Sequence, residues 1–198
     1  MLRNIPNRVD QPMLKTIVDH SSFGKYDFMY LRIDFANNCN VGYAFLNFQL
    51  PEDIIDFVQA VRGQQWFNSE KVAEVSYATM QGRECLVQKF RNSSVMQEHP
   101  SSRPKLYFTL GHPKAGQEEP FPRADNLLKL ARSNQNASQI GLFNHARGSG
   151  YPTPDRHRRG QYDRGTSFAD MEELEAENRY LRGITGMRRQ RLTDGTYL

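Results

Sequence analysis

The octamer at residues 41–48, Val-Gly-Tyr-Ala-Phe-Leu-Asn-Phe, constrains the fold of this chain more than any other segment. Side chains alternate across a strand, so Tyr43 and Phe45 are expected on one face and Ala44 and Leu46 on the other. The second face is apolar and indicates a buried core, whereas the first carries two rings. Aromatic residues are also simply common in strands, so the neighbouring elements must decide what the rings do.

Those elements follow the order strand, helix, strand, strand, helix, strand. Apolar spacing, proline-containing helix starts and glycine stops indicate helices after Asp10 and Pro51. We expect strands at 1–5, 26–32, 41–48 and 71–78, with an added helix at about 81–92. This order predicts an α+β, ferredoxin-like βαββαβ fold, in which both helices cover one face of the sheet and the other face is free.

On that free face we expect a platform for bases of single-stranded RNA. Phe28 and Tyr30 alternate with apolar residues and should join Tyr43 and Phe45. Stacking of a base on a ring contributes about 1–3 kcal/mol and tolerates any base. Base preference then needs polar groups beside the rings. The predicted RNA-binding residues are Tyr43, Phe45, Tyr30, Phe28, Arg3, Met1, Ser76 and Asn40.

Three alternatives stay open at this point. A register slip of one residue would turn Phe28 and Tyr30 into the core. The helix at 81–92 could lie across the sheet and cover the rings. The module could also bind a peptide or a partner protein through its sheet or its helices, although modules of that kind usually lose the octamer aromatics.

Composition excludes several other classes. Two cysteines make no disulfide framework, and no apolar run is long enough to span a membrane. The five histidines are scattered, and residues 111–116 have the outer glycines of a phosphate loop without its lysine. We therefore expect no enzyme, cofactor, metal site or small-molecule substrate, and a location in the nucleus or cytoplasm.

The second half of the chain differs in charge and composition. Residues 1–99 hold 10 Lys+Arg and 11 Asp+Glu, and residues 100–198 hold 16 and 11. We expect a domain over 1–95, a disordered low-complexity linker over 96–165, a possible partner-binding helix over 166–183 and disorder over 184–198. The arginine- and glycine-containing stretch 156–165 would add a salt-sensitive attraction to RNA.

Two motifs, the octamer and the segment 2–5, carry a family resemblance. The octamer resembles the RNP signature of RNA recognition motifs, with Val41 at its usual basic position, and residues 2–5 resemble the end of the companion hexamer. The hexamer's aromatic position falls at Met1, so the first strand is expected to be truncated. Stretches such as Arg3–Asn7, Tyr26–Leu31 and Asn38–Phe45 resemble the C-terminal RNA recognition motif of the Mei-two-like meiosis regulators over residues 1–108. The resemblance implies single-stranded RNA binding, post-transcriptional regulation of meiosis or differentiation, and a fragment of a longer protein with several such motifs.

Overall fold

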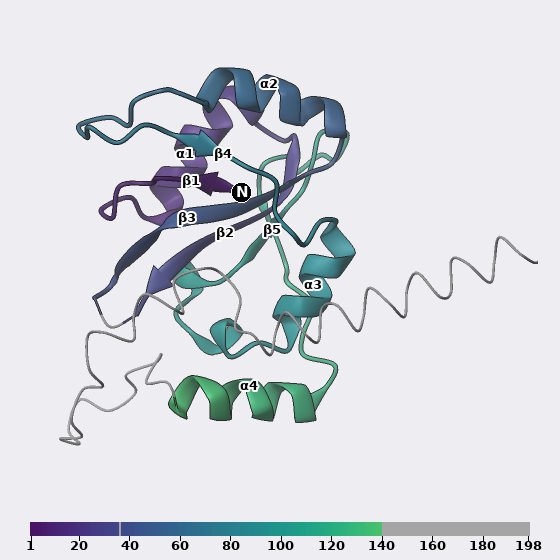
Figure 1. Cartoon of the computed structure of the whole chain (residues 1–198). Coiled ribbons are helices and arrows are strands. Elements are labelled where there is room, and N and C mark those ends of the chain that lie inside the picture. The colour runs from purple at the N-terminus through teal and green to yellow at the C-terminus, as the bar shows by residue number, and fades with distance from the viewer. Residues whose placement is uncertain (36, 140–198) are drawn as a thin grey trace, which may run out of the picture. The chain divides into compact units, whose positions relative to one another are not determined.

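The computed structural model describes residues 1–35 and 37–139, and the predicted α+β fold is confirmed (Figure 1). The first part of the chain has the expected order of elements. It consists of β1 (Leu2–Arg3), α1 (Gln11–Ser22), β2 (Tyr26–Asp34), β3 (Cys39–Phe48), α2 (Pro51–Val61) and β4 (Glu74–Val75). It is followed by α3 (Arg83–Arg91), the 3-10 turns η1 (Ser94–Gln97) and η2 (Pro100–Ser102), β5 (Lys105–Tyr107), β6 (Glu118–Glu119) and α4 (Leu127–Gln139).

The sheet has the strand order β4-β1-β3-β2-β5-β6, and each neighbouring pair is antiparallel. Leu2 lies opposite Ala44 of β3 on one side and Val75 of β4 on the other. Tyr30 of β2 lies opposite Phe45. The first four strands in this order are those of the ferredoxin-like fold, and β5 and β6 extend the sheet beyond β2.

Both early helices begin where the sequence predicts. The Asp10 carboxylate accepts a hydrogen bond from the Met13 N–H at 2.8 Å and caps α1, whose first turn holds Pro12. Pro51 opens α2, and two acidic residues in its first turn favour the positive end of the helix dipole. Figure 1 shows α1 and α2 on one side of the sheet and α3 and α4 on the other.

A core fills the space between the sheet and the first two helices. Leu2, Met29, Leu31 and Ala44 face this side and are fully buried. The helices contribute buried apolar side chains, among them Leu14, Val18 and Phe57. The predicted alternation of β2 and the octamer therefore has the right register. The fourth strand is shorter than the predicted 71–78: β4 ends at Val75, and Tyr77 beyond it is 84 % exposed.

A second core lies on the opposite face of the sheet, which we expected to be free. Phe28 and Tyr30 of β2 are buried there against Phe90 of α3. The Phe28 and Phe90 rings stack with centroids 5.6 Å apart, and Tyr30 meets Phe90 edge-on at 5.1 Å. Leu86, Val87, Val95 and Leu106 complete this cluster. The alternative in which the third helix covers part of the sheet is the observed one.

The expectation of a disordered linker at 96–165 is wrong for residues 96–139. In β5, Leu106 lies opposite Phe28 of β2, and its neighbour Tyr107 joins the first core. Each short element of this segment supplies only one or two apolar side chains to a core built mostly by other elements, so a window of local composition does not reveal it. The expected disorder at 140–165 and 184–198, and the expected helix at 166–183, lie outside the described residues. Within residues 1–35 and 37–139, no helix combines the length and hydrophobicity needed to cross a membrane.

Candidate nucleic-acid interface

Tyr43 and Phe45 lie on the face of the sheet opposite α1 and α2, and both are half-buried. Their rings meet edge-on, with centroids 5.7 Å apart and an interplanar angle of 87°. Arg3 of β1 lies opposite Tyr43 and is exposed. Arg32 of β2 donates a hydrogen bond from Nη1 to the Tyr43 hydroxyl at 2.7 Å, and its guanidinium carbon lies 5.8 Å from the centre of that ring. The contact orients the ring and places a positive charge beside it.

Arg32 was not among the residues predicted for this surface. It comes two residues after Tyr30, so the strand pattern could have assigned it to the same face. The β2–β3 register, in which Tyr30 lies opposite Phe45 and Leu31 opposite Ala44, places Arg32 across from Tyr43 when continued by one residue. Strand alternation was the available signal, and the register of β2 against β3 supplies the partner.

Asn40 holds the start of β3 in place and is 1 % exposed. Its side-chain amide donates to the carbonyl oxygens of Pro6 at 2.7 Å and Val9 at 2.8 Å, and its Oδ1 accepts the Gly42 N–H at 2.7 Å. Gly42 has a φ of 95°, a conformation that a residue with a Cβ rarely adopts. Asn40 thus has no exposed group for a base, and the expectation that it reads one is wrong.

Met1 and Ser76 lie just beyond the paired residues of β1 and β4, near Phe45, and both are half-buried. The Ser76 N–H donates to the Met1 carbonyl at 3.0 Å, which continues the pairing of β1 with β4. One step along the β1–β3 register, Met1 is placed opposite Phe45. The Ser76 hydroxyl is buried and has no hydrogen-bond partner within residues 1–35 and 37–139. Because this hydroxyl is buried, it is not accessible to a base in the structure, unlike the half-buried rings of Tyr43 and Phe45.

Phe28 and Tyr30 point to the predicted face but are covered by α3, with exposed fractions of 0 % and 7 %. Burial raises the pKa of the Tyr30 hydroxyl to about 12. Neither ring presents a face on which a base could stack. The expectation that these two residues are exposed is wrong, because their packing partners come from a segment later in the sequence.

Polar contacts fix the start of α3 to the sheet. Asn47 of β3 donates to the Asp27 carboxylate at 2.9 Å and accepts the Gly82 N–H at 3.1 Å. Next to it, Arg83 forms an ion pair with Glu119 of β6 at 2.7 Å. Burial raises the pKa of Asp27, although the Asn47 hydrogen bond opposes the shift.

Polar contacts also attach the C-terminal end of α3 to the segment before α4. The Asn92 side chain donates to the Asp125 carboxylate at 2.8 Å, and its Oδ1 accepts the backbone N–H groups of Asp125 and Asn126. Arg91 pairs with the same carboxylate at 2.9 Å. Helix α3 is thus held at both ends as a structural part of the domain.

The cations near the half-buried rings of Tyr43 and Phe45 are not neutralised by carboxylates. Within the described part of the chain, Arg3, Arg32, Arg8 and Lys71 form no ion pair, and the last two donate to neutral oxygens. Lys15, Lys25, Arg83, Arg91 and Lys105, by contrast, each bind a carboxylate. Positive charge without a carboxylate partner is therefore present beside Tyr43 and along the segment that follows β1, and also at Arg62, Lys89 and Lys129 elsewhere in the described residues.

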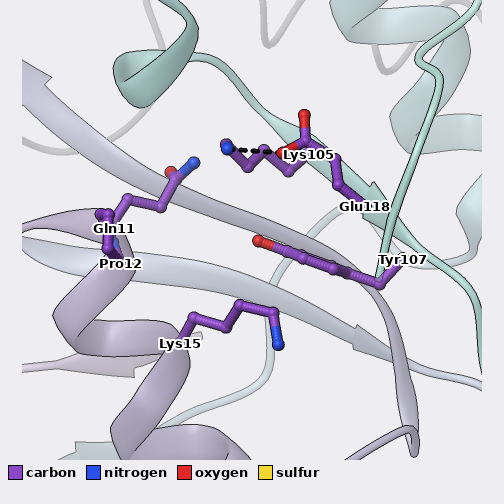
Figure 2. A pocket seen from close by; sticks show the side chains of 6 residues that line it. All are labelled: Gln11, Pro12, Lys15, Lys105, Tyr107 and Glu118. Carbon is purple, nitrogen blue, oxygen red and sulfur yellow. Dashed lines mark hydrogen bonds and ion pairs between the residues drawn. The ribbon is translucent and has the colours of Figure 1, made fainter. Parts of the chain in front are cut away.

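A small cavity of about 160 Å³ lies between α1 and β5, on the helical side of the sheet (Figure 2). Gln11, Pro12 and Lys15 face Tyr107 across it, with Lys105 and Glu118 at its margin. Lys105 binds Glu118 at 2.6 Å, and Lys15 binds Asp19. Both lysines are neutralised, so the cavity offers little to an anion. Within residues 1–35 and 37–139, no group of three His, Cys, Asp or Glu is placed to hold a metal ion.

Comparison with known proteins places these residues in a family context. Residues 1–91 match the family model of RNA recognition motif 2. The chain is 52 % identical over 145 residues to meiosis protein mei2 of Schizosaccharomyces pombe. The aligned region covers 72 % of this chain and 19 % of that protein. The chain is 50 % identical over 146 residues to protein MEI2-like 1 of Arabidopsis thaliana (73 % and 16 %) and 46 % identical over 147 residues to protein MEI2-like 4 of Oryza sativa subsp. japonica (73 % and 14 %). The matched region thus spans less than a fifth of each of these relatives.

Proposed function

The chain carries an RNA recognition motif of the Mei2-like family, and from that premise we propose that the uncovered part of its sheet binds single-stranded RNA. The observation that carries this proposal is the pair of half-buried rings of Tyr43 and Phe45, held on the sheet face and bordered by Arg3 and Arg32. Rings of this kind stack on bases, and cations beside them attract phosphates.

The proposed platform is narrower than the sequence suggested. Phe28 and Tyr30 belong to the second core, and the half-buried Phe45 packs against its edge, so two rings rather than four are available for stacking. Base-edge contacts are assigned to the exposed Arg3, because the Ser76 hydroxyl is buried, and Met1 packs beside the base on Phe45. Because only two bases stack directly, a larger share of the affinity comes from phosphate contacts and is sensitive to salt.

We further propose that the RNA bound here serves the control of meiosis or differentiation in the nucleus or cytoplasm. The support is the likeness to proteins whose names refer to meiosis. In this role the chain acts by recognising transcripts and performs no chemistry on them. The expected absence of a cofactor, the possible protein contact through residues 166–183 and the basic stretch at 156–165 remain predictions.

A second candidate function is protein binding through the outer surface of α1 and α2, which we call the helical face. Its support is a set of apolar side chains that α1 and α2 leave exposed, with Met13 at 49 %, Ile17 at 39 % and Ile55 at 59 %. A partner that covered these side chains would leave the sheet free, so the two functions are compatible.

Titration of a labelled single-stranded RNA pool into the full chain tests the sheet proposal. Replacing both rings (Tyr43→Ala with Phe45→Ala) should weaken binding by about thirtyfold or more, since each stacked base contributes about 1–3 kcal/mol. Tyr43→Phe keeps the ring and loses only the hydroxyl that Arg32 contacts, so we expect nearly unchanged affinity. Fluorescence anisotropy gives the dissociation constants.

The matched control is Ile55→Ala, which removes an exposed apolar side chain from α2 on the opposite side of the sheet. Circular dichroism should show the same fold for every variant. Unchanged affinity in the folded double variant, or no RNA binding by the wild type, would overturn the proposal and direct attention to the helical face.

A further inference from the structure

The hairpin between α2 and β4 presents an aromatic ring to solvent from a fixed backbone. Phe67 at its tip is 87 % exposed, whereas the adjacent Trp66 is buried in the first core. The hairpin is closed by the Trp66 N–H to the Lys71 carbonyl at 3.0 Å and by the Ala73 N–H to the Gln64 carbonyl at 2.8 Å. The ring is therefore displayed by an ordered turn rather than by a frayed loop.

The segment that follows β1 clamps this hairpin. The Asn4 side chain donates to the Val72 carbonyl at 2.8 Å, and Arg8 donates to the carbonyl oxygens of Phe67, at 3.0 Å, and of Asn68. Figure 1 shows the loop before β4 beside the loop that follows β1. These contacts hold a guanidinium next to the backbone that carries the exposed ring.

Lys71 adds a second cation from the hairpin itself. Its ammonium group donates to Asn7 Oδ1 at 3.2 Å and to the Ile5 carbonyl at 3.5 Å. Within the described residues neither Lys71 nor Arg8 binds a carboxylate, so their charges are not compensated by an ion pair. A ring for a base and two cations for phosphates are the groups that a nucleotide requires.

The hairpin is also continuous with the proposed platform. Arg3 lies opposite Tyr43 on β3, and the next residue, Asn4, is bonded to the hairpin. On the β2 side the sheet face is closed by α3. A strand of RNA that stacks on β3 is thus more readily extended across β1 toward the hairpin than across β2.

We propose that Phe67, Arg8 and Lys71 form a second nucleotide subsite, which binds a further base and its phosphates of an RNA strand already held on Tyr43 and Phe45. The inference rests on the proposed function, and it adds a position outside the sheet at which the RNA is recognised. A short RNA fills the sheet alone, whereas a longer one reaches both positions.

The test measures binding of the full chain to two single-stranded probes of about 4 and about 12 nucleotides, a range that covers typical site sizes. Phe67→Ala should weaken binding of the longer probe by about five- to a hundredfold, the equivalent of one stacked base, and leave the shorter probe unchanged. Phe67→Trp keeps a stacking surface and should bind the longer probe as tightly as the wild type. Arg8→Gln and Lys71→Gln should each lower the slope of log affinity against log salt by about 0.7.

Matched controls are Leu128→Ala, an apolar side chain on α4 that is 75 % exposed, and Lys129→Gln on the same helix. Unchanged binding of the longer probe by Phe67→Ala, with binding still dependent on Tyr43 and Phe45, would overturn the subsite and leave the sheet proposal intact. Absence of RNA binding by the wild type would overturn both proposals.

Discussion

Two halves of one sheet face differ in what covers them, although they carry the same kind of side chain. On β3, Phe45 is half-buried, and its neighbour on this face, Tyr43, lies opposite Arg3 and accepts a hydrogen bond from Arg32. On β2, its register partner Tyr30 is 7 % exposed and lies under α3. The alternation of each strand places both rings on this face, and only the later segment decides which of them meets solvent.

The charges of the two halves differ in the same sense. Around β5, β6 and α3, the cations Lys105, Arg83 and Arg91 are held by carboxylates and stabilise the covering segment. Around β1, Arg3 has no such partner among the described residues, although Glu74 lies opposite it on β4. In the covered half these three cations stabilise internal structure, with Lys89 of α3 left unpaired, and in the other half Arg3 is unpaired beside Tyr43.

The largest expected effect comes from the covered half. Phe28→Ala removes a ring with no exposed surface that stacks on Phe90, and should lower the free energy of unfolding by about 3–5 kcal/mol. Urea unfolding followed by circular dichroism measures the change. Ile55→Ala on the surface should change stability by less than about 1 kcal/mol. A small loss for Phe28→Ala together with a large loss of RNA affinity would mean that α3 moves aside and Phe28 belongs to the platform.

A smaller effect should distinguish the cations of the two halves. Arg3→Gln should weaken RNA binding at low salt by roughly 0.5–1 kcal/mol and lower the salt slope by about 0.7, because an uncompensated charge near Tyr43 is lost. Lys105→Gln should leave the slope unchanged, since Lys105 of the covered half is paired with Glu118. Anisotropy titrations over a range of salt concentrations give both slopes. Equal salt slopes for the two variants would contradict the prediction that only the unpaired cation contributes to RNA binding.

The smallest effect concerns the pH dependence of the covering segment. Burial raises the folded-state pKa of Asp27 above 3.8, so its favourable contribution is complete below that pH and is lost as pH rises through the folded pKa. Asp27→Asn should therefore be more stable than the wild type at neutral pH, with a difference that disappears in acid. The effect is limited because the Asn47 hydrogen bond offsets part of the burial.

Asp125→Asn provides a control of opposite sign. The hydrogen bond from Asn92 lowers the pKa of Asp125, so this carboxylate stabilises the fold above 3.8 and loses its contribution as pH falls through the folded pKa. The variant should be less stable than the wild type at neutral pH and equal to it in acid. Thermal melts at several pH values measure the stability of each variant relative to the wild type. If both differences changed with pH in the same direction, the opposite pKa shifts of Asp27 and Asp125 would be contradicted.

Local pattern in the sequence was sufficient for the first four strands, the first two helices and the direction of the octamer side chains. The reason is that amphipathic alternation and helix starts such as Asp10 and Pro51 act over a few residues. The same pattern placed Arg3, Tyr43 and Phe45 on one face. The structural role of Asn40 and the proposed role of Phe67 were missed because each depends on contacts with segments more than 30 residues away.

The sequence by itself therefore determined the ferredoxin-like fold and the face on which its aromatic side chains lie. Tertiary structure decided how much of that face is exposed. The sequence predicted a helix at 81–92 but left open where it packs, whereas η1 and β5 each bring too few apolar residues to be recognised alone, and these elements form a core only when they meet Phe28 and Tyr30. Burial is a property of the assembled partners, whereas strand direction is a property of the strand.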